Sequence, residues 1–269
     1  MRLSRVLALS TSLVAAAAGL LVAAAPAQAT TAAHYVALGD SYSAGVGTDN
    51  YTSASGSCRR SPQGYPQLWA NAHSVASFDF DACSGAVTTD VLNNQLGPLS
   101  SATTLASITI GGNDAGFTTV MEDCITESDS GCQSAITTAE NYVNGTLIGR
   151  LDTLYAAIRS HAPNATVVVL GYPEFYASPG TCVVGMDSAK HSYINGGADA
   201  LDSRISTEAG KYGFRFVDVR SSFAAGHEIC GSSTGWLHSV VWTDIDESYH
   251  PTVAGYSQGY LPELDTVTG

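Results

Sequence analysis

Five short runs of β-forming residues recur along the chain, separated by stretches whose apolar residues have helical spacing. The runs are residues 34–38, 74–81, 105–110, 166–170 and 214–219. They are apolar rather than alternating, which is typical of strands buried on both faces of a sheet. Strands that alternate with helices in this way predict an α/β fold in which a parallel sheet is covered on both faces.

The helices are predicted in residues 62–73, 88–96, 137–161 and 188–212, with another beginning at Thr252. We expect Pro62 to open the first helix, Thr88 or Thr89 to cap the second, and Gly213 to cap the fourth. The loops 170–188 and 219–250 are too long for simple connectors, and we expect them to form walls of a substrate cleft.

The first 29 residues have the three regions of a secretory signal peptide. Arg2 and Arg5 form a basic start, residues 6–25 are almost wholly apolar, and Ala27-Gln28-Ala29 is a small-residue cleavage site. A membrane anchor is the alternative, but the run is rich in alanine and is followed by Pro26 and the cleavage site. The sequence therefore predicts a signal peptide in 1–29 and a single extracellular domain in 30–269.

The charge balance limits the partners of this domain. The formal net charge is −13, and Lys190 and Lys211 are the only lysines. An acidic surface repels phosphate backbones, so we expect no nucleic-acid binding. It also offers no basic patch for an anionic membrane, so any contact with lipid would depend on apolar loops. We expect a monomer without a stable membrane anchor.

Six cysteines in an exported chain favour three disulfides. Zinc binding is less favoured because no C-x-x-C pair is present. Several pairings are compatible with the sequence. We favour neighbours in order, which gives Cys58–Cys83, Cys124–Cys132 and Cys182–Cys230.

Residues suited to acyl transfer follow three of the predicted strands. Ser41 follows the first in Gly39-Asp40-Ser41, Gly85 follows the second, and Asn113 follows the third in Gly111-Gly112-Asn113-Asp114. Chemistry in open α/β sheets gathers at the carboxyl ends of strands. A serine nucleophile needs a base and donors for the developing oxyanion. The late His250 supplies an imidazole, glycine a bare N–H, and asparagine an amide donor.

These four blocks, in this order, resemble those of the SGNH hydrolases, the GDSL esterase and lipase family, and the resemblance extends from His34 to the C-terminal helix. Within that family the exported, six-cysteine chain resembles actinobacterial lipases, esterases and phospholipases. The resemblance implies a three-layer, flavodoxin-like fold with a central five-stranded parallel sheet. It also implies Ser41 as nucleophile, His250 as base, and an oxyanion hole of the Ser41 N–H, the Gly85 N–H and the Asn113 side chain.

The chain departs from the family pattern beside the histidine. The family usually has D-x-x-H, and this chain has Glu247 at the aspartate position. Glutamate could orient the imidazole but is longer by one methylene. The backbone carbonyl of Ser248 could hold the ring instead and leave a Ser-His dyad. We regard these two as comparable, with Asp244 and Asp246 behind them.

The remaining polar candidates are interpreted as structural. His227 and His238 lack the Pro-Thr that follows His250, and no histidine has metal-ligand spacing, so we expect no metal or cofactor. The acidic run from Asp244 is predicted to be a solvated loop rather than a calcium site. Asp40 and Asp114 are expected to anchor turns.

Aromatic loop residues could line a pocket for an acyl chain or could simply pack the loops. They are Tyr42, Tyr172, Phe175, Tyr176, Trp236 and Trp242. The function predicted is a secreted serine hydrolase of lipid esters. A carbohydrate (acetyl) esterase and a catalytically inert binding protein are the alternatives.

Overall fold

Five parallel strands form the central sheet of the computed structural model, in the order β2-β1-β3-β4-β5. They are β1 (Ala33–Gly39), β2 (Val75–Phe80), β3 (Leu105–Thr109), β4 (Thr166–Leu170) and β5 (Arg215–Val217). The structure describes residues 32–179, 182 and 186–269, which belong to one unit, and the predicted signal peptide lies outside them. The expected five-stranded parallel sheet is confirmed.

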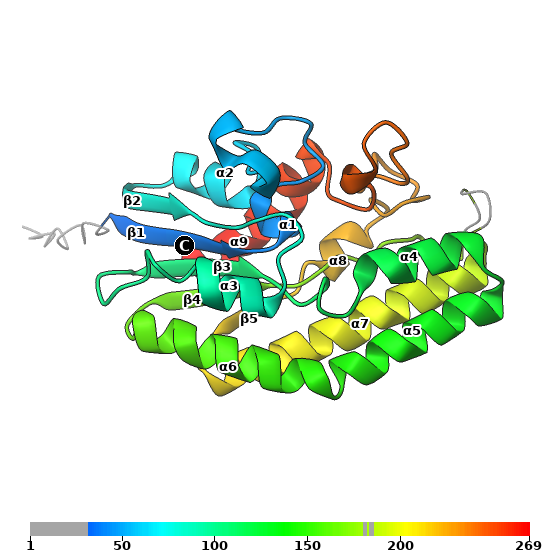
Figure 1. Ribbon diagram of the computed structural model, residues 1–269. Helices are drawn as coiled ribbons and strands as arrows, with labels where there is room; N and C mark the ends of the chain where they lie inside the picture. The colour runs from blue at the N-terminus through cyan, green and yellow to red at the C-terminus, as the bar shows by residue number, and fades with distance from the viewer. Residues whose placement is uncertain (1–31, 180–181, 183–185) are drawn as a thin grey trace, which may run out of the picture. The chain divides into compact units, whose positions relative to one another are not determined.

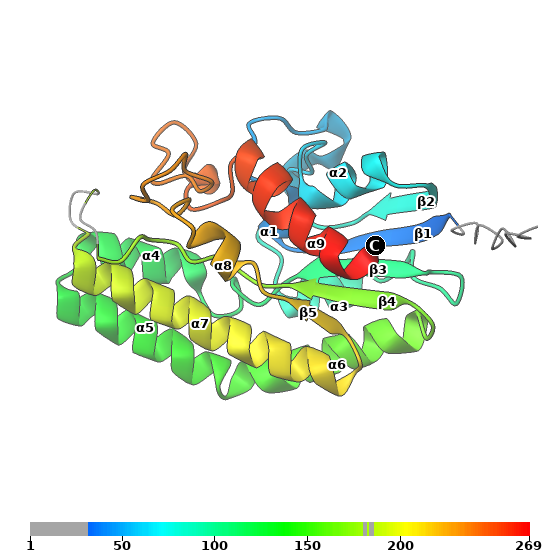
Figure 2. The ribbon, with the colours of Figure 1, turned by 180° about the vertical axis from the view of Figure 1, so that it is seen from behind.

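Helices cover both faces of this sheet (Figures 1 and 2). One face carries α2 and α9, which contact each other, and the other carries α3, α6 and α7. The helices are α1 (Ser41–Ala44), α2 (Tyr65–Ala72), α3 (Thr88–Asn94), α4 (Phe117–Thr126), α5 (Asp129–Val143), α6 (Thr146–His161), α7 (Ser188–Lys211), α8 (Arg220–Phe223) and α9 (Leu261–Thr268). Helix α5 packs against both α4 and α7 beyond the sheet, past the carboxyl ends of the strands (Figure 1).

The order of the strands determines where in the sheet a binding site is expected. The chain runs from β1 to its neighbour β2 and then crosses back to β3 on the other side of β1. Strands β1 and β3 end level with each other, because Gly39 pairs with Thr109. A crevice between strands whose connections leave in opposite directions is the usual ligand position in such sheets.

The prediction of one helix over 137–161 is wrong. Two helices, α5 and α6, are separated at Asn144 and Gly145, and Gly145 has non-helical dihedral angles (φ −120°, ψ −88°). Both helices bury an apolar face, so helical spacing continues through the break and hides it. Helix α4 was not predicted.

Several predicted helix starts also differ. Helix α2 begins at Tyr65 with Pro66, not Pro62, in its first turn. Neither Thr88 nor Thr89 caps α3; its N-cap is Val87, whose N–H donates to the Asp90 carboxylate at 3.0 Å.

The ends of α7 and the C-terminal helix lie near their predicted positions. Gly213, in the left-handed region (φ +67°), follows the end of α7. The C-terminal helical segment begins just after Thr252, with a wide π-type turn over Gly255–Tyr260 before α9. No helix in the described part of the chain is long and apolar enough to cross a bilayer.

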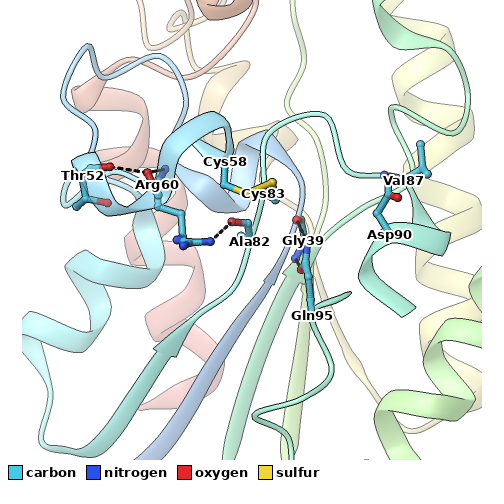
Figure 3. Close-up of a disulfide and its surroundings, with 10 residues drawn as sticks. Gly39, Thr52, Cys58, Arg60, Ala82, Cys83, Val87, Asp90 and Gln95 are labelled. Atoms are coloured by element: carbon cyan, nitrogen blue, oxygen red, sulfur yellow. Dashed lines mark hydrogen bonds between the residues drawn. A yellow bond between two sulfur atoms is a disulfide. The ribbon is translucent and has the colours of Figure 1, made fainter. Parts of the chain in front are cut away.

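Three disulfides join Cys58 to Cys83, Cys124 to Cys132 and Cys182 to Cys230, which are neighbours in sequence order. The second joins α4 to the start of α5. The first joins the segment after β1 to the loop that follows β2, beside the carboxyl end of β1 (Figure 3).

Candidate active site

Ser41 stands at the point where β1 turns into the short helix α1. Gly39 has φ +119°, and a Cβ there would lie 2.4 Å from the Thr109 carbonyl oxygen, so a side chain is excluded. Asp40 caps α1 by accepting the Tyr42 N–H at 3.0 Å. The side chain of Gln95 holds both backbone groups of Gly39, at 2.7 and 2.9 Å (Figure 3). The backbone around the serine is therefore fixed before any substrate binds.

His250 faces Ser41. Its Nε2 lies 2.7 Å from the Ser41 Oγ, and its Nδ1 lies 3.0 Å from the carbonyl oxygen of Ser248. A carbonyl oxygen can only accept, so Nδ1 carries the ring proton and donates it. Nε2 is then left to accept from the serine hydroxyl, which is the state that a general base requires.

Burial lowers the pKa of His250 from its ordinary value of about 6.5 to about 4, and the positive charge of Arg59 acts in the same direction. The Ser248 carbonyl opposes this shift by accepting from the ring. The imidazole is therefore neutral at ordinary pH.

Glu247 does not face the imidazole. Its Oε1 accepts from the Tyr51 hydroxyl and, at 3.1 Å, from the Asp49 N–H. The side chain is only 5% exposed. Of the two groups considered comparable as partners of the histidine, the Glu247 carboxylate anchors the loop, and the Ser248 carbonyl contacts the ring.

The acidic run that begins at Asp244 differs from the solvated loop that was predicted. Arg59 forms a two-pronged ion pair with Asp244 and lies 3.4 Å from Asp246. Its guanidinium also stacks over the Tyr51 ring at 4.8 Å. Sequence reasoning missed Tyr51 and Arg59, because nothing local to either residue signals a partner almost 200 positions away. In the described ranges no cluster of three or more metal-ligating side chains occurs.

Two further contacts hold the backbone next to His250. Tyr249 is a non-glycine residue in the left-handed region (φ +65°), and its carbonyl accepts from the buried Tyr42 hydroxyl. The Ser248 Oγ accepts the Val241 N–H at 2.9 Å. Together with the Glu247 contacts, these bonds aim the Ser248 carbonyl at the ring.

Gly85 and Asn113 lie on loops that touch each other. Gly85 is in the left-handed region (φ +77°), and none of the hydrogen bonds within the described residues uses its N–H. The Asn113 Nδ2 donates to the Ala86 carbonyl at 3.1 Å, which leaves its second amide proton for another acceptor. The Cys58–Cys83 disulfide and a 3.1 Å bond from the Ser84 N–H to the Cys58 carbonyl hold the Gly85 loop (Figure 3).

One tyrosine connects the loop that contains Ser41 to the loop that contains Asn113. The Tyr172 hydroxyl donates to Asp40 at 2.5 Å and accepts the Gly112 N–H at 2.9 Å. Burial raises the pKa of Asp40 to about 7, although the bond from Tyr172 opposes the shift. Asp114 accepts the Thr88 N–H and hydroxyl at 2.8 and 2.7 Å. Both aspartates thus anchor turns, as expected.

An apolar cavity adjoins this region between α4, α5 and α7. Its walls include Gly112, Tyr172 and Phe175. Of the six aromatic residues considered for a pocket wall, Tyr172 and Phe175 line this cavity. Tyr42 instead packs against His250, with ring centroids 5.1 Å apart. Trp236 stacks on His227 at 3.7 Å.

None of the other aromatic and histidine candidates lines the cavity or faces Ser41. Tyr176 is buried and stacks on His191 at 4.2 Å, whereas Trp242 is 84% exposed. His227 Nδ1 and His238 Nε2 lie 2.7 and 2.8 Å from backbone carbonyl oxygens. Neither histidine faces Ser41.

A parallel sheet with a serine and a neutral imidazole at its carboxyl edge is an arrangement used by serine-type ester hydrolases. Residues 37–258 match the sequence profile of the GDSL-like Lipase/Acylhydrolase family. The chain belongs to this family and is a carboxylic ester hydrolase.

Its relatives include Lipase 1 of Streptomyces coelicolor, which is 54% identical over 268 residues, or 98% of this chain and 99% of the relative. The crystal structure of phospholipase A1 from Streptomyces albidoflavus NA297 is similar, with a TM-score of 0.84 and 57% identity over 88% of this chain and 99% of that one. The extracellular lipase of Streptomyces rimosus also gives a TM-score of 0.84, with 51% identity over 87% and 99% of the two chains.

Proposed function

We propose that the chain is a secreted hydrolase of lipid esters in which Ser41 is the nucleophile and His250 its general base. The observation that carries this proposal is the 2.7 Å contact between Ser41 Oγ and His250 Nε2, with Nδ1 held by the Ser248 carbonyl. This is a dyad in which a backbone carbonyl does the orienting that a carboxylate does in a triad.

The proposed reaction has two halves. His250 Nε2 takes the proton of the Ser41 hydroxyl as Oγ attacks the ester carbonyl carbon. The oxyanion accepts from the Ser41 and Gly85 N–H groups and from the Asn113 amide, and the imidazolium then protonates the leaving alcohol. In the second half a water molecule, deprotonated by Nε2, attacks the acyl-enzyme, and the fatty acid leaves as Ser41 regains its proton.

The apolar cavity is the proposed site of the acyl chain. It begins beside Gly112, the neighbour of Asn113, and its wall residue Tyr172 is bonded to Asp40, the neighbour of Ser41. An acyl chain bonded to Ser41 would therefore need to extend only past the asparagine loop to reach apolar surface. The names of the relatives, lipase and phospholipase A1, agree with such a substrate.

Export is proposed from residues 1–29 and from the three disulfides, which are typical of oxidising compartments. The mature protein would begin at Thr30 and form one domain. The Streptomyces rimosus relative is described as extracellular.

A substrate panel on the purified, disulfide-intact protein tests the proposal. Release of fatty acid from phosphatidylcholine or a triglyceride is expected, and release of acetate from acetylated xylan in preference to both would identify a carbohydrate esterase. An organophosphate should label Ser41 covalently. An inert binding protein would have no activated serine and would not be labelled.

The pKa of His250 predicts the acid limb of the activity profile. Catalysis needs the neutral imidazole, and burial lowers the pKa of His250 to about 4. We therefore expect kcat/KM for a soluble ester to stay level down to about pH 5 and to be half-maximal about pH 4. A midpoint at or above about 6.5, the ordinary histidine value, would contradict this environment for the ring.

Replacement of Glu247 separates its anchoring role from a catalytic one. Gln at this position can still accept from Tyr51 and Asp49, so Glu247→Gln should keep kcat within roughly threefold, a change of less than about 1 kcal/mol. Glu247→Ala leaves both donors without an acceptor and should lower the free energy of unfolding by about 1–3 kcal/mol. Steady-state kinetics and thermal unfolding measure the two effects. If Glu247→Gln instead lowered kcat by several orders of magnitude, Glu247 would be the catalytic partner of His250.

A further inference from the structure

The exposed large apolar side chains are concentrated in the part of the sequence around His250. Among the described residues the large hydrophobic side chains that are exposed are Trp242 at 84%, Ile245 at 61% and Val253 at 39%. All three lie within eight positions of His250 in the sequence. Grouped exposed apolar side chains mark interaction sites more often than scattered ones do.

Two of these side chains are carried by a closed loop, residues 241–248. The Val241 N–H donates to the Ser248 Oγ at 2.9 Å and closes the ends of the loop. Within it the Asp244 N–H donates to the Val241 carbonyl at 3.2 Å and the Ser248 N–H to the Ile245 carbonyl at 3.1 Å. The loop is folded on itself, yet it leaves Trp242 and Ile245 in solvent.

The loop is also held to the body of the protein on its polar side. Arg59 pairs with Asp244 and Asp246, and Glu247 is buried against Tyr51. Its last residue, Ser248, supplies the carbonyl that contacts His250. A surface that meets Trp242 and Ile245 would therefore lie next to the Ser41–His250 pair. Figures 1 and 2 show the orange segment that contains the loop beside the start of the C-terminal helical segment.

The charge of the loop and of the whole chain indicates which kind of surface the loop could bind. The chain has a net charge of −13, and the loop contains three acidic residues and no basic one. Arg59 neutralises part of that charge, but the Asp246 carboxylate stays 71% exposed. An anionic lipid surface would be repelled, whereas a zwitterionic one would not. Tryptophan has an apolar body and an N–H that suit the headgroup region of a bilayer.

We propose that the 241–248 loop docks the enzyme onto a zwitterionic lipid surface, with Trp242 and Ile245 inserted at the level of the headgroups. This inference rests on the proposed lipid ester hydrolase function. It adds a docking element distinct from the acyl-chain cavity and places it on the loop that orients the base.

The experiment uses the Ser41→Ala variant, so that binding is measured without hydrolysis. Phosphatidylcholine vesicles should shift its tryptophan emission to the blue, because Trp242 is exposed while Trp69 and Trp236 are only 4% and 8% exposed. In the Ser41→Ala background, Trp242→Ala should lower the vesicle partition coefficient by roughly tenfold or more. Ile245→Ala should lower it by less, and Trp242→Phe should lower it least. Phosphatidylglycerol vesicles should bind more weakly than phosphatidylcholine at low salt.

Activity on a soluble ester and activity on vesicles separate the docking role of the loop from the hydrolase function. With Ser41 present, Trp242→Ala should hydrolyse a soluble short-chain ester at the normal rate but act more slowly on vesicles. If the parent enzyme hydrolysed neither the soluble ester nor the vesicle lipid, the proposed lipid hydrolase function would be refuted. Unchanged partition of Trp242→Ala, a preference for anionic vesicles, or a dimer in solution that Trp242→Ala abolishes would each overturn the docking proposal.

Discussion

Replacement of Ser41 by alanine is expected to lower kcat for ester hydrolysis by roughly a million-fold, as removal of the nucleophile does in other serine hydrolases. Without the hydroxyl no acyl-enzyme can form, and His250 Nε2 loses its 2.7 Å partner. The residual rate would come from the oxyanion donors acting on a water molecule.

The fold should tolerate this change. Ser41 is only 7% exposed, but alanine fits the first turn of α1 and the Asp40 cap does not use the serine side chain. One side-chain hydrogen bond is lost, so the free energy of unfolding should change by about 1 kcal/mol or less. The exposed Ser134→Ala on α5 is the matched control and should keep full activity. Hydrolysis of an aryl ester by Ser41→Ala at the parent rate would refute the assignment of the nucleophile.

The sequence was informative about the sheet because strand burial leaves a direct trace in composition. Strand β4 occupies the predicted residues 166–170, and β1 exceeds its prediction by one residue at each end. A strand covered on both faces must be apolar throughout, so the ends of the apolar run mark the ends of the strand. Helices are buried on one face only, and the α5–α6 break fell inside a continuous apolar periodicity.

The residues proposed for catalysis could be selected from the sequence for a related reason. Ser41, Gly85 and Asn113 each follow a strand, and strand ends bring distant residues to one edge. The partner of His250 could not be chosen in advance, because it depends on a left-handed residue at Tyr249 and on where Glu247 finds its donors. Those donors, Tyr51 and Asp49, are supplied by the far end of the chain. Only the folded structure brings them together.

Asn113→Ala is expected to lower kcat by about 10²–10³ with a much smaller change in KM, which is the usual effect of removing one oxyanion donor. The amide would bind the carbonyl oxygen only as it becomes charged, so its loss raises the barrier more than it weakens substrate binding. Asn113→Asp should be at least as damaging, because it replaces the donor by an acceptor and adds a negative charge where an oxyanion must develop.

A second role of Asn113 must be separated from the first. Its Nδ2 also donates to the Ala86 carbonyl, next to Gly85, so alanine could loosen the other donor as well. A structural loss should appear as a lower melting temperature, whereas loss of the oxyanion donor alone should leave the melting temperature close to that of the parent enzyme. The exposed Asn164→Ala, which follows Pro163, is the control and should match the parent enzyme. Full activity in Asn113→Ala would remove the side chain from the oxyanion hole and leave the two backbone N–H groups to hold the charge.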